Sequence, residues 1–193
     1  MRWWVFLIMG IVAVGLDSGL ASVFTLRGLG WATPSFAACL LAFIALQARP
    51  RTVFWAAWVL GLMMDLSPTA AAGSAGIPVI GPQTLAAVAA VQVVLLLRPV
   101  VFRRRVITIA VMAGIVMVCL GLGAAALETV RWWLPWTHAL APPPTGQRVL
   151  TVTASAGYTV LVGIPISAFL VLTGSWWRFD APPGRLDYAG SRW

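Results

Sequence analysis

The sequence contains very little charge. Only 9% of its 193 residues are charged and 61% are hydrophobic, whereas a soluble domain carries about 25% charged residues. So few charged side chains cannot cover a surface that faces water, and we therefore predict a membrane protein. Lysine is absent, and arginines give the chain its net charge of +8. Because these arginines stand between apolar runs, we interpret them as topology signals and predict no nucleic-acid partner.

The sequence also lacks the side chains that most enzymes and metal sites use. His138 is the single histidine, and it stands in a connection rather than beside a nucleophile. Cys39 and Cys119 fall inside apolar runs without a CxxC spacing, which favours two buried thiols over a disulfide or metal site. The residues before Asp65 do not fit the GxGD setting of intramembrane aspartyl proteases. We predict no metal, no cofactor and no enzymatic activity.

Apolar runs divide the sequence into six candidate membrane spans. A helix that crosses a bilayer needs about 20 apolar residues, and the third and fourth runs are short by this measure. The spans are roughly 3–26, 31–48, 52–66, 84–98, 106–127 and 150–174. They predict one transmembrane domain over residues 1–174 and a short cytoplasmic tail over 175–193. The first run resembles a cleaved signal peptide, but Asp17 inside it favours a retained helix.

The distribution of the arginines fixes the orientation of these spans. Positively charged residues favour the cytoplasmic side of a membrane. Six spans with a cytoplasmic N-terminus leave only Arg27, Arg131 and Arg148 on the outer side. We therefore predict an all-α integral membrane protein, a bundle of about six transmembrane helices with both termini in the cytoplasm.

Two aspartates interrupt the apolar runs. Asp17 and Asp65 each follow the predicted inner end of their helix by about fourteen residues, which places both roughly 20 Å above that boundary. A carboxylate inside a bilayer should face the bundle interior or a cavity. One interpretation is an intramembrane polar site that contains both. The other is structural: Asp65 hydrogen-bonds to backbone groups freed by the Gly- and Pro-containing connection 67–83.

A stretch in the middle of the chain resembles a known family. GLMMDLSP at 61–68, GPQTL at 81–85 and the basic stretch LRPVVFRRR at 97–105 are similar to the rod shape-determining protein MreD family. The residues that match its motif are Gly61, Asp65, Ser67 and Gly81. The matching cytoplasmic basic loop contains Arg98, Arg103, Arg104 and Arg105. Ser67 falls one residue earlier than in the family motif, and the choice of Gly81 implies an insertion before it.

This resemblance implies a non-enzymatic scaffold in the cytoplasmic membrane of a bacterium. MreD-like proteins bind the bitopic membrane protein MreC and act indirectly with the MreB filament, the transglycosylase RodA and penicillin-binding proteins. Together these proteins maintain cell shape and guide peptidoglycan synthesis. The basic loop would contact membrane lipids or an acidic partner surface, or it would act only as a topology signal. Small residues such as Gly114, Gly121 and Gly123 would pack against a partner helix or within the bundle itself.

The alternative function belongs to another class. MreD-like proteins are similar in architecture to the S-component fold, the substrate-binding membrane subunit of energy-coupling-factor transporters for small molecules. Such a subunit would need several polar contacts around a ligand. The predicted spans contain few polar residues, which favours the scaffold.

Overall fold

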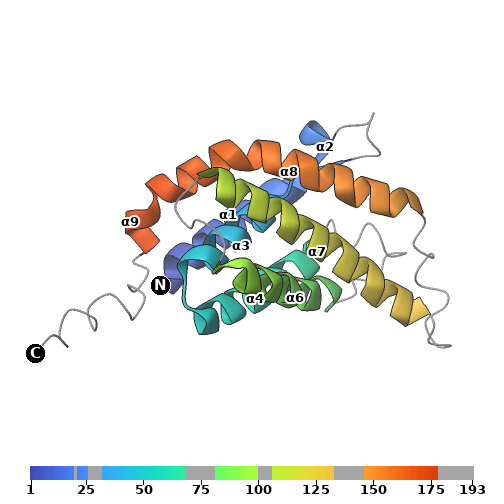
Figure 1. Ribbon diagram of the computed structural model, residues 1–193, viewed down its shortest axis with the longest axis horizontal. Helices are drawn as coiled ribbons and strands as arrows, with labels where there is room; N and C mark the ends of the chain where they lie inside the picture. Colours follow the sequence, from blue (N-terminus) through green and yellow to red (C-terminus); the bar gives the residue numbers. More distant parts are fainter. Residues whose placement is uncertain (20, 26–31, 68–80, 100–105, 133–145, 178–193) are drawn as a thin grey trace, which may run out of the picture.

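The computed structural model describes residues 1–19, 21–25, 32–67, 81–99, 106–132 and 146–177, and the regular elements in these ranges are all α-helices (Figure 1). This confirms the predicted all-α class. In chain order the helices are α1 (Trp3–Gly19), α2 (Ala21–Phe24), α3 (Phe36–Gln47), α4 (Pro50–Asp65), α6 (Pro82–Leu97), α7 (Val106–Trp132), α8 (Gly146–Leu172) and α9 (Gly174–Trp177).

Helix α3 forms the centre of the bundle. Every residue from Ala37 to Leu46 is buried, and a helix that is hydrophobic all round belongs in a core. It packs against α1, α4, α6, α7 and α8. The two longest helices, α7 and α8, run along the outside of this arrangement (Figure 1). The short central helix therefore positions all of its neighbours.

Glycines bring α7 close to α8 and α6. A Cβ atom at Gly121 would lie 2.6 Å from a methyl carbon of Val152, and Gly114 meets Val160 at similarly close range. On another face of α7, a Cβ at Gly123 would lie 3.0 Å from Ala86 of α6. Of the two predicted uses of these small residues, the structure shows packing within the bundle.

The helix boundaries differ from the predicted spans in informative ways. The span predicted to begin near 31 corresponds to α3, which begins at Phe36 because the residues before it serve as its cap. Helices α7 and α8 extend past their predicted ends at 127 and 150. Two segments, Val106–Leu127 and Val149–Leu172, are long and apolar enough to cross a membrane. Arg103, Arg104, Arg105, the connection 68–80 and the tail beyond 177 lie outside the described residues.

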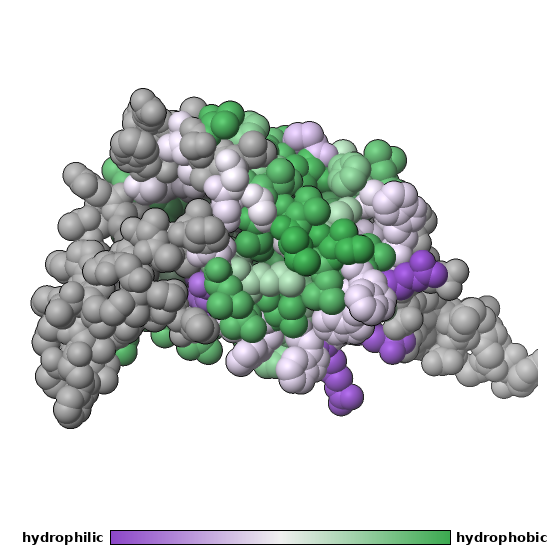
Figure 2. Space-filling view, turned by 180° about the vertical axis from the view of Figure 1, so that it is seen from behind, coloured by the Kyte–Doolittle hydropathy of each residue, from purple (hydrophilic) through white to green (hydrophobic). Residues whose placement is uncertain are grey.

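Charge is separated along the bundle. Among the arginines whose side chains are described, Arg2, Arg49, Arg51 and Arg98 lie at the end where α1 begins and α3 and α6 finish. Asp17 and Asp65 lie toward the opposite end, beside the first residues of α3 and α6. Between these ends the surface is largely apolar, and Figure 2 shows a broad hydrophobic area with hydrophilic residues near its margins.

Candidate functional site

Asp65 caps the first turn of α6. Its side chain is 1% exposed, and its two carboxylate oxygens accept four hydrogen bonds. The donors are the backbone amides of Gly81 (2.9 Å), Gln83 (3.0 Å) and Thr84 (3.0 Å) and the hydroxyl of Thr84 (2.6 Å). The first amides of a helix have no partner inside the helix, and its N-terminus favours negative charge. Asp65 supplies both the acceptors and the charge from a different helix.

Two glycines allow this contact between α4 and α6. Gly61 lies one helical turn before Asp65, on the same face of α4. A Cβ atom at Gly61 would lie only 2.6 Å from the Cα of Thr84, so only glycine permits α6 to approach here. Gly81 has a φ angle of +126°, which residues with a side chain rarely adopt. Three predicted motif residues, Gly61, Asp65 and Gly81, therefore meet at one junction, which we call the α4–α6 junction.

Asp17 caps α3 in the same manner. Its carboxylate accepts hydrogen bonds from the amides of Phe36 (2.6 Å) and Ala37 (3.1 Å) and from the hydroxyl of Ser35 (3.0 Å). The Ser35 hydroxyl oxygen in turn accepts a bond from the amide of Ala38 at 3.1 Å. Each aspartate thus lies near the end of one helix and caps the start of the next full-length helix.

Helix α8 holds the residues before α3 from the other side. The amide of Thr33 donates to the Ser155 hydroxyl at 3.2 Å, and the amide of Ser35 donates to the Thr159 hydroxyl at 3.1 Å. The Thr159 hydroxyl also donates to the Ser155 carbonyl at 2.7 Å. Through these bonds the start of α3 is attached to both α1 and α8.

A cavity of about 280 Å³ lies between the two capped helix ends. Asp17, Ser35, Ser67 and Gln83 contribute polar groups to its wall, and the other lining residues are mostly apolar. Asp65 itself is enclosed by its four donors rather than by the cavity. The cavity adjoins both caps, through Asp17 and Ser35 on one side and Gln83 on the other, and the shared level of the two aspartates in a bilayer stays a prediction.

The two carboxylates differ in the number of hydrogen bonds that they accept and in their access to the cavity. An ionised carboxylate offers about four lone-pair positions. Asp65 accepts four bonds from within the protein, three at Oδ2 and one at Oδ1, which favours the structural interpretation of its side chain. Asp17 accepts three and lines the cavity, which leaves room for one further donor. The interpretation of Asp17 as part of a polar site stays a prediction.

Arg98 meets the opposite ends of the same two helices. It follows the last residue of α6, and its Nη1 donates to the carbonyl oxygen of Ala48 at the end of α3, at 2.8 Å. Helix C-termini favour a positive charge. The carboxylates and Arg98 therefore balance the dipoles of α3 and α6 at both ends.

The remaining predicted residue of the motif, Ser67, is 8% exposed and lines the cavity. Sequence reasoning missed Thr84, which donates twice to Asp65. Its position in GPQTL, after a glycine and a proline that mark the start of a helix, is the signal that places it in the first turn, where free amides need an acceptor. Within the described part of the chain, no three His, Cys, Asp or Glu side chains lie close enough together to hold a metal ion.

Comparison of the sequence with protein-family models, with curated proteins and with solved structures gave no match.

Proposed function

We propose that the chain is a membrane scaffold of the MreD type. It forms a bundle of about six transmembrane helices in the cytoplasmic membrane of a bacterium, with both termini in the cytoplasm. It binds an MreC-like bitopic protein and, through that partner, acts with an MreB-like filament, a RodA-like transglycosylase and penicillin-binding proteins. In this role it maintains cell shape and guides peptidoglycan synthesis without catalysing a reaction.

The observation that carries this proposal is the α4–α6 junction. Gly61, Asp65 and Gly81, which match the family motif, each have a packing or hydrogen-bonding task there. A buried carboxylate that accepts four hydrogen bonds from the protein rigidifies a bundle, and this one does not line the cavity. Such a motif suits a scaffold, which must present a fixed outer surface to the helices of its partners.

The surface of the bundle supports the membrane part of the proposal. Large apolar side chains are exposed along α4, among them Phe54, Trp55 and Trp58. Exposed apolar area of this extent marks an interaction with lipid or protein. Among the arginines whose side chains are described, the gathering at one end agrees with the tendency of positive residues to stay in the cytoplasm.

Affinity purification of the tagged chain in mild detergent from its native host tests the scaffold. We expect an MreC-like protein to be recovered with the wild type and to be lost with Asp65→Asn. The matched control is Leu66→Asn, because Leu66 is adjacent and 63% exposed, and it should retain the partner. Recovery of an ATPase pair with a coupling subunit instead would overturn the proposal.

The cavity beside Asp17 favours a second candidate function, that of a substrate-binding subunit of an energy-coupling-factor-type transporter. Its volume of about 280 Å³ and its mixed wall, with Asp17 and Gln83 beside Met117 and Leu120, suit a small molecule with polar and apolar parts. A purified sample should then release a stoichiometric small molecule on denaturation, detectable by mass spectrometry. A sample that releases none after purification without added ligand would speak against this candidate.

A further inference from the structure

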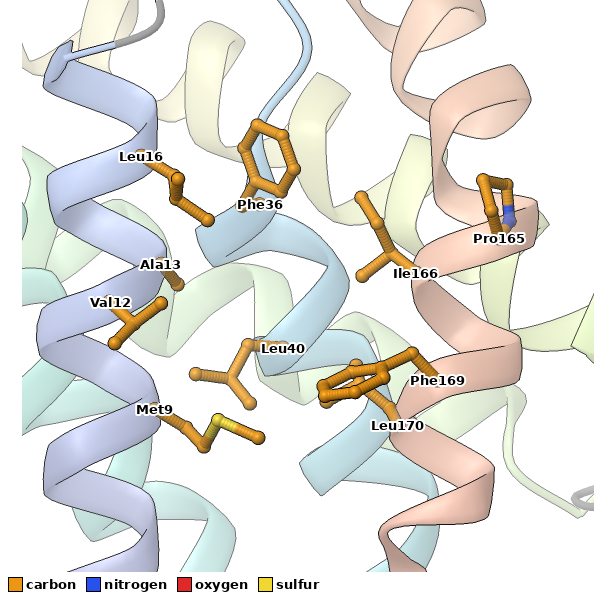
Figure 3. Close-up of a pocket in the computed structure, with 10 residues that line it drawn as sticks. All are labelled: Met9, Val12, Ala13, Leu16, Phe36, Leu40, Pro165, Ile166, Phe169 and Leu170. Atoms are coloured by element: carbon orange, nitrogen blue, oxygen red, sulfur yellow. The ribbon is translucent and has the colours of Figure 1, made fainter.

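A groove of about 320 Å³ lies between α1 and α8, with α3 as its floor (Figure 3). Met9, Val12 and Leu16 form one wall, and their spacing places them on one face of α1. Phe169 of α8 stands on the opposite wall, and Leu40 of α3 lies between them (Figure 3). All 10 residues that line the groove are apolar.

The groove opens on the outside of the bundle. Val12 is 49% exposed and Phe169 is 55% exposed, whereas Leu40 on the floor is 2% exposed. An unfilled space of this kind deprives its walls of van der Waals contacts. If the helices span a membrane, the opening faces the hydrocarbon, and an apolar occupant enters from there.

Size decides between the apolar occupants that a membrane offers. A helix with side chains is about 10 Å across and rises about 5.4 Å per turn, so one turn encloses roughly 420 Å³. One turn alone therefore exceeds the 320 Å³ of the groove. A hydrocarbon chain is a single methylene wide and carries no polar group that the apolar walls would leave without a partner. The groove thus encloses the methylenes of a single acyl chain more fully than it encloses a helix, whose turns would lie mostly outside it.

Charge identifies the kind of lipid. Arg2 stands seven residues before Met9, and its carbonyl accepts the amide of Phe6, so it continues the register of α1. Seven residues are close to two helical turns, which places Arg2 on the face of the groove and about 10 Å from Met9 along the axis. The Arg2 side chain is exposed. A guanidinium at this position attracts the phosphate of an anionic headgroup.

We infer that the groove between α1 and α8 holds one acyl chain of an anionic phospholipid whose phosphate lies near Arg2. The inference rests on the membrane location proposed above. Helix α1 buries only Phe6, Gly10 and Ala13 against the bundle, so it is the helix that gains most from such a filling. The lipid supplies contacts that bridge α1 and α8 across the floor of α3.

Native mass spectrometry of the full chain tests this inference. Delipidated protein is titrated with phosphatidylglycerol or with phosphatidylcholine of the same acyl chains. We expect one lipid molecule to bind per protein, and phosphatidylglycerol to bind more tightly than phosphatidylcholine. Val12→Trp fills the groove and should weaken that binding at least tenfold. Ile11→Trp is the matched control, because Ile11 is the neighbouring residue, is 63% exposed and does not line the groove. Arg2→Gln should remove the preference for phosphatidylglycerol.

Equal lipid binding by Val12→Trp and Ile11→Trp would overturn the inference. A photo-crosslinking residue in place of Phe169 gives a second readout in native membranes, where we expect a lipid adduct. Capture there of a second copy of the chain or of a partner helix would also overturn it. Failure of the scaffold proposal is visible separately, since purification then recovers no MreC-like protein while the lipid still binds.

Discussion

At the residue scale, Asp65 gathers four hydrogen bonds in a buried position. A hydrogen bond to a charged group contributes about 1.5–3 kcal/mol to stability. Removal of the acceptor also leaves its donors buried without a partner, which adds their desolvation cost. We expect Asp65→Ala to lower the free energy of unfolding by about 3 kcal/mol or more. Unfolding of the purified protein in detergent measures this. Leu66→Ala, at the exposed neighbouring position, should change little, and equal effects of both substitutions would refute the role of Asp65.

Two glycines in helix interiors should respond oppositely to alanine. A Cβ at Gly61 meets the backbone of Thr84, whereas a Cβ at Gly15 has nothing within 4 Å. Overpacking costs about 1–3 kcal/mol, while alanine in an open helix position gains up to about 1 kcal/mol over glycine. Gly61→Ala should therefore destabilise the protein and Gly15→Ala should not. The same unfolding measurement distinguishes them, and a stabilised Gly61→Ala variant would contradict the close approach of α4 and α6.

The aspartates show how far single residues can be interpreted from the sequence. A carboxylate in an apolar run must find partners, and the Gly- and Pro-containing connection after Asp65 indicated where they would be. Thr84 was not predicted, because its hydroxyl reaches Asp65 only when α6 packs against α4. Nor could the sequence tell that Asp65 accepts four hydrogen bonds and Asp17 three, since this depends on the number of donors within reach.

At the element scale, each cap belongs to a different helix, so their effects should be separable. Asp17→Ala removes the acceptor of the Phe36 and Ala37 amides, and Asp65→Ala removes that of Gln83 and Thr84. We expect faster hydrogen exchange at the start of α3 in the first variant and at the start of α6 in the second. Mass-spectrometric exchange on both variants measures this. Equal acceleration at both helix starts in each variant would show that the caps do not act locally.

The boundaries of these helices explain the main differences between prediction and structure. The apolar run placed the start of α6 at 84, two residues after Pro82, where the helix begins. The start of α3 was placed too early because residues 32–35 are apolar or small, although they form the cap rather than the helix. Hydropathy alone does not separate a helix from the segment that caps it. The deciding contact comes from Asp17, on another helix.

At the scale of the whole molecule, the short core helix α3 needs partners for its backbone ends that the long outer helices α7 and α8 do not need inside a bilayer. Helix α3 has 12 residues and a length of about 18 Å, less than the roughly 30 Å of a bilayer core. It is surrounded by protein, and its ends are satisfied by Asp17 and Ser35 at the start and by Arg98 at the finish. A short helix with both ends partnered can lie within a membrane without exposing its backbone to lipid.

The orientation of the bundle gives the last prediction. Helix α7 has 27 residues and a length of about 40 Å, enough to reach past both surfaces of the hydrocarbon core. Exposed Arg51 lies at the end of the bundle assigned to the cytoplasm, and Val130, 63% exposed, lies near the far end of α7. Single substitutions Arg51→Cys and Val130→Cys are made after Cys39 and Cys119 have been replaced by alanine.

A membrane-impermeant maleimide should label Val130→Cys in intact cells and Arg51→Cys only after permeabilisation. The physical reason is the cost of moving the arginine-rich end across the membrane, which keeps Arg2, Arg49, Arg51 and Arg98 on the side of synthesis. The reverse labelling pattern would show that the bundle has the opposite orientation, with the cationic end of the α1–α8 groove on the outer side of the membrane. Labelling of both positions in intact cells would mean that Arg51 is not cytoplasmic, and the arginine pattern would then need an explanation other than topology.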